Sequence, residues 1–251
     1  MGVVNITPDS FSDGGRFLDR EAAVSHARRL AGEGAEIIDI GGESTRPGAE
    51  PVSEEEELSR VLPVLRSLHD LAVSVDTRRP RVMREALAAG ASMINDVDAL
   101  SAPGALEAVK ESHCAVCLMH KKGEPATMQR DPHYDDVVRE VKDFLKQRVD
   151  AALGAGIAAA RISVDPGFGF GKTVEHNLEL LARLSELSEF PIVAGMSRKS
   201  TIGKLTGRGV EERLAGSLSA ALLALQAGAR ILRVHDVKET RDVIAVWEAS
   251  K

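Results

Sequence analysis

The sequence predicts an α/β fold, a single (β/α)8 barrel of the TIM type, from three observations. Short apolar, β-branched runs alternate with amphipathic helical patterns along the whole chain, eight of each. The 251 residues give about 31 per β/α unit, close to the usual size of such a barrel. Aromatic residues make up only 3% of the chain, so the core must consist of Ala, Val, Ile and Leu, as barrel interiors commonly do.

Each predicted strand is an apolar run, and each predicted helix follows it with apolar residues at helical spacing. The strands are expected near 2–6, 36–41, 73–76, 93–97, 114–119, 161–165, 192–196 and 231–235. The helices are expected near 20–33, 54–71, 79–89, 104–111, 135–154, 174–188, 211–227 and 238–249. No linker or second pattern interrupts this order, so residues 1–251 are expected to form one domain. The alternative is a doubly wound open sheet, but its nucleotide-binding versions need a glycine fingerprint after the first strand, which is missing here.

Charge and composition exclude several functional classes. The net charge is −6 with acidic and basic residues interspersed, and no basic stripe predicts nucleic-acid binding. The acidic run 54–57 is expected to be the solvated first turn of a helix, with Ser53 as its N-cap. No signal peptide or apolar run of membrane-spanning length is present. We therefore expect a cytoplasmic protein.

Two cysteines, Cys114 and Cys117, have the CxxC spacing of a redox pair but lie within an apolar run. In an extended strand, positions i and i+3 point to opposite faces and cannot pair. A redox pair would instead sit at a helix N-terminus, where the thiolate is stabilised. We expect buried structural thiols.

Polar residues follow most of the predicted strands, where a barrel would bring them together. Parallel strands place all their carboxyl ends on one face, which makes an enzyme or a ligand-binding protein the default expectation. Asp76, Asn95 and Asp165 each close or follow such a run. Carboxylates beside an amide suit a heterocycle with adjacent N–H donors and a carbonyl, such as an amino-oxo-pyrimidine ring. Lys199 would supply the opposite polarity. The alternative for each single Asp is the N-cap of the next helix.

A second set consists of Arg46, Arg233 and His235, together with Asn5. Arg233 and His235 share strand parity, so both should point to the same face. Two guanidiniums and an imidazole predict an anion site, most naturally for phosphate or pyrophosphate. Asn5 offers one neutral oxygen, which suits Mg²⁺ held mostly by water and phosphate oxygens. The alternative is that Arg233 forms a structural ion pair with a strand carboxylate such as Asp76.

The segment GFGFGKT (167–173) resembles a phosphate loop but departs from the Walker pattern. Pro166 occupies the position of the first glycine, and the loop is one residue too short. We expect its glycines to give the backbone room beside a ligand, with Phe168 and Phe170 as walls. No Ser-His-Asp or Cys-His set is apparent in the sequence. The remaining candidate is a site for a flat heterocycle and a polyanion, which suits a substrate that carries its own leaving group.

Together these motifs resemble the dihydropteroate synthases, over the whole chain and in order. The matching segments are MGVVNITPDSFSDGG (1–15), GGESTRPGA (41–49), SVDT (74–77), INDV (94–97), LMH (118–120), DPGFGFGK (165–172), GMSRKS (195–200) and RVHDV (233–237). The resemblance implies a homodimeric (β/α)8 barrel in bacterial folate synthesis, and the target of the sulfonamides. Such an enzyme joins 6-hydroxymethyl-7,8-dihydropterin diphosphate to 4-aminobenzoate and releases pyrophosphate, with Mg²⁺ present.

The resemblance also implies roles for single residues. Asp76, Asn95, Asp165 and Lys199 match the pterin pocket, and Asn5 matches the metal ligand. The contacts of the pyrophosphate and its loop match Thr45, Arg46, Arg233 and His235, and the positions around the aminobenzoate match Phe170, Ser200, Pro47, Phe11 and Asp13. We expect Arg233, His235, Lys199 and Asp76 to act in catalysis.

Two departures from the family pattern stand out. Relatives often have Met after the histidine of the fifth strand, whereas Lys121 follows His120 here. Relatives also usually carry an N-terminal extension that covers the barrel bottom, so we expect added upstream sequence to raise the melting temperature. Two rival functions remain at this stage, a pterin-binding methyltransferase domain and a pterin-binding protein without catalysis. Neither would need the anion set.

Overall fold

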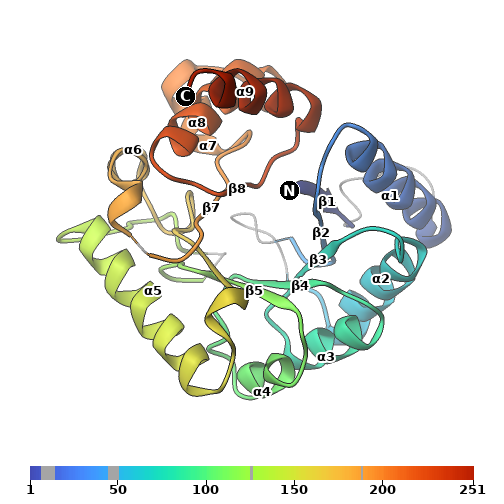
Figure 1. Ribbon diagram of the computed structural model, residues 1–251. Helices are drawn as coiled ribbons and strands as arrows, with labels where there is room; N and C mark the ends of the chain where they lie inside the picture. Colours follow the sequence, from blue (N-terminus) through green and yellow to red (C-terminus); the bar gives the residue numbers. More distant parts are fainter. Residues whose placement is uncertain (7–14, 45–50, 125–126, 188) are drawn as a thin grey trace.

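The computed structural model describes residues 1–6, 15–44, 51–124, 127–187 and 189–251, with backbone alone for 15–19. Short parallel strands occupy the centre, and helices surround them as an outer ring (Figure 1). The strands are β1 Gly2–Asn5, β2 Ile38–Gly41, β3 Val73–Asp76, β4 Met93–Asp96, β5 Ala115–Met119, β6 Ile162–Asp165, β7 Val193–Ala194 and β8 Ile231–Leu232. The helices are α1 Gly15–Gly32, α2 Glu54–Ser67, α3 Pro80–Ala88, α4 Ala105–Lys110, α5 Val137–Gly154, α6 Val174–Ala182, α7 Ser200–Thr206, α8 Leu214–Gln226 and α9 Val237–Ala249.

The strands follow one another around the ring in sequence order. β1 to β6 form one parallel sheet, and β7 pairs with β8 in a second one. A single bridge, Val164↔Ile192, joins β6 to the approach of β7, and another, Gly2↔Val234, joins β1 to the residues after β8. The ring is thereby closed, and the predicted (β/α)8 barrel is confirmed.

Side chains alternate along each strand between the barrel interior and the layer beneath the helices. In β3, Val73 and Val75 are buried in the large outer core, whereas Asp76 lines a pocket at the barrel mouth. The lower interior is filled by a small separate cluster, which consists of Met1, Met93, Ala115, Cys117, Val193 and Ile231. The inward positions at the carboxyl ends of the strands therefore carry the polar side chains above an apolar floor.

The two cysteines confirm this alternation. Cys117 belongs to the interior cluster, whereas Cys114 packs in the outer core. Both are buried and free. Cys114 lies directly before β5 and Cys117 lies within it, and the two thiols are structural and on opposite sides of the sheet, as their spacing predicted.

Helix α7 was missed in the sequence. It has only seven residues and follows directly after the polar segment 195–199, so its apolar pattern was too short to register. No helix within the described ranges is long and apolar enough to cross a membrane.

The acidic first turn of α2 was only partly predicted. Ser53 caps the helix, and its hydroxyl accepts a hydrogen bond from the Glu56 amide at 3.2 Å. However, Glu57 is only 1% exposed and forms an ion pair with Arg79. The expectation of a solvated run is therefore wrong for Glu57, because the fourth residue of α2 turns toward the start of α3.

Candidate active site

A pocket at the mouth of the barrel gathers residues from the carboxyl ends of six strands, β3 to β8, and from the loops after them. The parallel register places Asp76 beside Asn95 on neighbouring strands. The residues that line the pocket are Asp76, Asn95, Val97, Met119, Asp165, Phe170, Gly195, Lys199 and Arg233. The four residues predicted for the heterocycle, Asp76, Asn95, Asp165 and Lys199, are thus brought together.

Arg233 lies in the same pocket and holds two carboxylates. Its Nε donates to Asp39 at 2.6 Å, and its Nη2 donates to Asp76 at 2.9 Å. The alternative interpretation of Arg233, an ion pair with strand carboxylates, therefore describes its contacts in this structure. Arg233, directly after β8, thus lies among the residues predicted for the heterocycle, because β8 closes the barrel and the Arg233 side chain reaches across to β2 and β3.

Asp39 was not singled out in the sequence. It lies in the middle of β2, is fully buried, and also accepts a hydrogen bond from the Asn95 amide at 3.3 Å. Its second carboxylate oxygen has no hydrogen-bond partner. A charged residue between Ile38 and Ile40, which point to the outer core, was the available signal, because alternation must then turn that charge into the barrel.

Burial displaces the protonation equilibria of the pocket. It raises the pKa of Asp76 to about 7, against the opposing effect of Arg233. Burial also raises the pKa of Asp165 and lowers that of Lys199 to about 8. Displaced pKa values in a concave, ligand-accessible site are typical of functional residues.

Lys199 is held by the loop after β6. Its Nζ donates to the carbonyl of Phe168 at 2.5 Å and lies 4.7 Å from the centre of the Phe170 ring. Asp165 is fixed by the amide of Gly167, which donates to its Oδ1 at 2.7 Å. Phe170 therefore lines the pocket as predicted, together with the ammonium group that it faces.

The prediction for Phe168 was wrong. Its side chain is 1% exposed and packs in the outer core, so only its carbonyl reaches the site. The glycines of this loop are required by a neighbouring loop and not by a ligand. Cβ atoms at Gly167 and Gly171 would lie 1.8 Å and 2.1 Å from the carbonyl oxygens of His120 and Lys122. The missing side chains therefore allow the loop after β5 to approach this loop closely.

The remaining predicted residues lie around or beyond this pocket. His235 contacts the hydroxyl of Ser197 through its Nδ1 at 3.1 Å. Asn5 ends β1 and is half-buried, and Ser200 is exposed as the first residue of α7. Phe11, Asp13, Thr45, Arg46 and Pro47 lie outside the residues that the structure describes.

The comparisons with known proteins agree with this geometry. Residues 1–235 match the model of a family described as pterin binding enzyme. The chain belongs to this pterin-binding enzyme family. It is 52% identical over 255 residues to the dihydropteroate synthase of Escherichia coli strain K12, covering 100% of this chain and 90% of that one.

Two solved structures of the Xanthomonas albilineans dihydropteroate synthase are also similar. The first, with 4-aminobenzoic acid, has a TM-score of 0.94 at 56% identity. The second, in complex with 7,8-dihydropteroate, has a TM-score of 0.91 at 54% identity. Each comparison covers 100% of this chain and 92% of the other.

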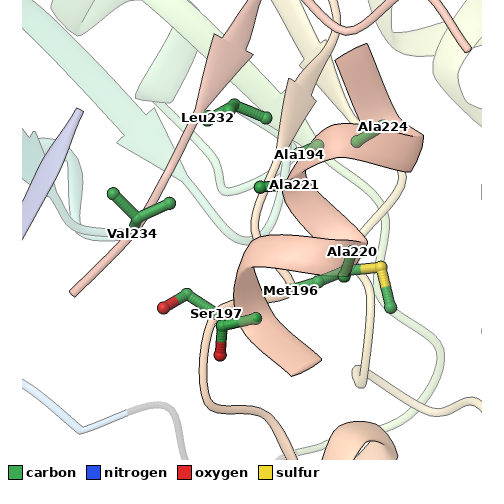
Figure 2. Close-up of a pocket in the computed structure, with 9 residues that line it drawn as sticks. Ala194, Met196, Ser197, Ala220, Ala221, Ala224, Leu232 and Val234 are labelled. Atoms are coloured by element: carbon green, nitrogen blue, oxygen red, sulfur yellow. The ribbon is translucent and has the colours of Figure 1, made fainter. Parts of the chain in front are cut away.

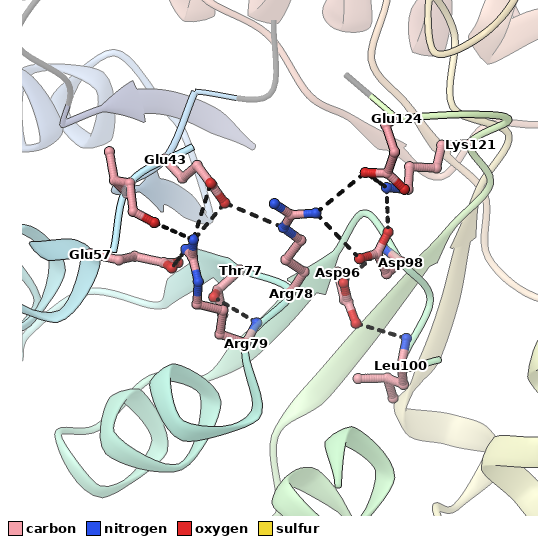
Figure 3. Close-up of polar contacts among 11 residues, drawn as sticks. Glu43, Glu57, Thr77, Arg78, Arg79, Asp96, Asp98, Leu100, Lys121 and Glu124 are labelled. Atoms are coloured by element: carbon pink, nitrogen blue, oxygen red, sulfur yellow. Dashed lines mark hydrogen bonds and ion pairs between the residues drawn. The ribbon is translucent and has the colours of Figure 1, made fainter. Parts of the chain in front are cut away.

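In this pterin-binding enzyme a further group of charges lies on the segments after β2, β3, β4 and β5 (Figure 3). We call it the rim cluster; it consists of Glu43, Glu57, Arg78, Arg79, Asp98, Lys121 and Glu124. Arg79 contacts Glu43 at 3.2 Å and also Glu57. Arg78 lies 3.4 Å from Glu43, 4.0 Å from Asp98 and 3.7 Å from Glu124. The rim cluster thus ties together the loops that follow β2, β3, β4 and β5.

A second cavity lies between α8 and strands β7 and β8 (Figure 2). It measures about 10 Å³ and is lined mainly by aliphatic side chains, with Ser197 and Ser217 as its polar members. That volume holds about one water molecule at most. It is a packing gap between α8 and the strands of the barrel.

Proposed function

We infer that the chain has dihydropteroate synthase activity. It joins 6-hydroxymethyl-7,8-dihydropterin diphosphate to 4-aminobenzoate, and the products are 7,8-dihydropteroate and pyrophosphate. The observation that carries this inference is the mouth pocket. It sets the carboxylates of Asp76 and Asp165 and the amide of Asn95 beside two cations, Lys199 and Arg233.

The pterin is held by Asp76, Asn95, Asp165 and Lys199. An amino-oxo-pyrimidine ring presents adjacent N–H donors, and a carboxylate accepts two of them at once. Lys199 donates to a ring oxygen or nitrogen, a role that its position between Asp165 and the Phe168 carbonyl supports. The neutral amide of Asn95 can both donate and accept hydrogen bonds, which fits a ring that presents both donors and acceptors.

The pyrophosphate is bound by Arg46 and Thr45 from the second loop and by Arg233 and His235 from the last strand. In the structure Arg233 is neutralised by Asp39 and Asp76. Binding of the diphosphate then requires Arg233 to share its guanidinium between these carboxylates and the incoming anion.

The 4-aminobenzoate lies against Phe170 and Ser200, with Pro47, Phe11 and Asp13 from the first two loops around it. Phe170 supplies an aromatic face at the edge of the pterin pocket. Sulfonamides, which share the shape of this substrate, are then expected to compete for the same space.

The reaction needs little proton transfer from the protein. The bond between the pterin methylene carbon and the diphosphate oxygen breaks, and its electron pair leaves with pyrophosphate. The resulting cation is delocalised into the ring, where Asp76 stabilises it electrostatically. The amine nitrogen, neutral at pH 7, forms the new bond to that carbon and releases one proton to solvent. Arg233 and His235 stabilise the departing charge, and Lys199 and Phe170 position the amine.

We propose that Mg²⁺ binds together with the diphosphate. Within the described ranges no group of three acidic, histidine or cysteine side chains could hold a metal ion. A single amide oxygen, that of Asn5, fits an ion whose other ligands are water and phosphate oxygens. When bound, Mg²⁺ neutralises charge on the leaving group.

We further propose a cytoplasmic homodimer. Helix α8 turns its small residues inward, whereas Leu223 is 51% exposed on its outer side. Leu205 and Val210, from the segments just before α8, are 53% and 49% exposed. A face of this kind supports contact with a second copy of the chain. Sedimentation of the purified chain tests the dimer, and a single monomeric species at micromolar concentration contradicts it.

Pyrophosphate release tests the activity. The purified chain is supplied with the pterin diphosphate, with and without 4-aminobenzoate and Mg²⁺. We expect release that depends on both. Pterin binding by calorimetry without any release supports a non-catalytic pterin-binding protein instead. Steady-state release at an equal rate with and without the amine contradicts the synthase reaction.

A further inference from the structure

Lys172 is a buried lysine that the proposed reaction does not use. It ends the GFGFG segment after β6 and is only 3% exposed. Its Nζ lies 2.9 Å from Nδ1 of His120, 3.0 Å from the carbonyl oxygen of Gly167 and 3.1 Å from that of Phe170. Within the described ranges it forms no ion pair with a carboxylate. Burying a charged amine without a counter-ion costs free energy, and the hydrogen bonds that it donates offset part of this cost.

The three contacts of Lys172 match the hydrogen-bonding capacity of an amine next to an imidazole. An ammonium donates to both carbonyls and to an unprotonated Nδ1 of His120. A neutral amine donates to the two carbonyls and accepts from a protonated Nδ1. Burial lowers the pKa of His120 to about 2 and also lowers that of Lys172. The pair therefore remains hydrogen-bonded in either protonation state.

The two carbonyl oxygens that accept hydrogen bonds from Lys172 belong to the turn that forms one wall of the pocket. Gly167 and Phe170 are three residues apart, and the Phe170 amide also donates to the Gly167 carbonyl at 3.1 Å. Between them lies Phe168, whose carbonyl accepts from Lys199. Lys172 thus holds this turn from behind, and Lys199 contacts its pocket side.

His120 fixes this arrangement to the neighbouring strand. Its backbone amide donates to the carbonyl of Asp165 at 2.9 Å. Its ring packs edge-on against Phe144 of α5, with 5.0 Å between the ring centres. The Nδ1 acceptor that Lys172 meets therefore has a defined position with respect to β6 and the floor of the pocket.

We propose that Lys172 is a positioning residue for 4-aminobenzoate, acting through the turn 167–170 on Phe170 and Lys199. The hydrogen bonds to His120 and to the two carbonyls fix the aromatic face against which the amine substrate lies. The inference rests on the proposed places of Phe170 and Lys199 in the reaction. The pterin contacts of Asp76 and Asn95, on β3 and β4, do not depend on this turn.

The test compares Lys172→Met with Lys122→Met. Lys122 is a half-exposed lysine of the adjacent loop, and its Nζ contacts the His133 carbonyl and Glu140, away from the pocket. For Lys172→Met we expect the KM for 4-aminobenzoate to rise about tenfold, because small displacements of positioning groups have effects of that size or more. The dissociation constant of the pterin, from calorimetry, is expected to change less than this KM, because Asp76 and Asn95 keep their positions while only Asp165 and Lys199 contact the turn. Lys122→Met is expected to leave both constants unchanged.

A second pair of variants keeps the test decisive if Lys172→Met does not fold. His120→Asn retains an acceptor near the position of Nδ1, whereas His120→Leu does not. We expect His120→Leu to raise the KM for 4-aminobenzoate and His120→Asn to restore it. A fall in kcat with an unchanged KM, in proportion to the folded fraction, would mean that Lys172 only stabilises the fold. Wild-type chain that fails to turn over at all refutes the proposed function rather than the positioning role.

Discussion

Two charged clusters lie at the same end of the barrel, and they differ in how their charges are matched. In the pocket, Arg233 faces Asp39 and Asp76, and one oxygen of Asp39 has no hydrogen-bond partner. In the rim cluster, each charge faces an opposite charge from another element, as Arg79 faces both Glu43 and Glu57. Glu57 of the rim cluster also has a raised pKa and an oxygen without a hydrogen-bond partner. The pocket differs because its charged residues, Asp76, Asp165, Lys199 and Arg233, line a cavity, and displaced pKa values in a cavity indicate a ligand site. Ion pairs between elements indicate loops that are held in place.

The largest effect is expected from Arg233→Met. The substitution leaves Asp39 and Asp76 facing each other without their cation and removes a group that stabilises the departing pyrophosphate. Pyrophosphate release is expected to slow by about 10²-fold or more. Arg230→Met, at an exposed arginine before β8, is the matched control and should turn over normally. Near-normal activity in Arg233→Met would remove Arg233 from this role.

The second prediction concerns pH. Because burial raises the pKa of Asp76 to about 7, the folded chain keeps a proton that the unfolded chain releases near pH 4. The folded state then binds more protons than the unfolded state between pH 4 and 7, so the free energy of unfolding falls as pH rises through this window. Between pH 5 and 7 we expect Asp76 to account for a loss of about 2 kcal/mol.

Urea unfolding at several pH values measures this loss. Asp76→Asn should make the pH dependence shallower. A residual slope is expected from Asp96, whose pKa burial also raises to about 7. An identical slope in wild type and Asp76→Asn would contradict the raised pKa of Asp76.

The third prediction tests the rim cluster. Arg79→Gln leaves Glu57 buried without its cation, and it also removes a contact with the carbonyl of Val52. We expect the free energy of unfolding to fall by about 1–2 kcal/mol, less than for a fully buried pair, because the Arg79 side chain is 18% exposed. Thermal unfolding measures it, and the dissociation constant of the pterin should change little. A loss of pterin binding larger than the loss of stability would mean that the two clusters are not separate.

The smallest effect is expected from Arg81→Gln. Arg81 also joins α3 to α2, through Glu54 and Glu55, but its side chain is 45% exposed. Exposed pairs of this kind contribute about 0–1 kcal/mol. The melting temperature should stay close to that of wild type. A fall as large as that of Arg79→Gln would show that burial does not decide the strength of these pairs.

The sequence predicted the barrel because the same pattern, an apolar strand followed by an amphipathic helix, repeats along the chain. Each strand contributes an apolar run with a polar end, and β3 ends at Asp76 just as its run of alternating residues implies. Four residues of the pocket could be named for the same reason, since carboxyl ends of parallel strands must meet. β7 and β8 are shorter than expected, because hydrogen bonding between the strands ends before the apolar run does.

What the sequence did not predict depends on contacts between distant elements. Asp39 lies inside an apolar run, and alternation indicates that it faces the barrel interior, but its pairing with Arg233, 194 residues away, depends on the closed barrel. Glu57 resembles its three acidic neighbours in sequence, yet α3 brings Arg79 against it alone. Phe168 and Phe170 are two residues apart in a glycine-rich turn, and the positive φ of Gly167, Gly169 and Gly171 decides which ring enters the core.

The closure of the barrel has a consequence for its local opening. β1 to β6 are joined by ladders of three or four residue pairs, whereas only single bridges, Val164↔Ile192 and Gly2↔Val234, attach β7 and β8 to them. Segments with few backbone hydrogen bonds open at lower free energy than the rest of a fold. We expect amide deuterium exchange to start along these two seams, so that peptides covering β8 and α9 take up deuterium before those covering β4 and β5.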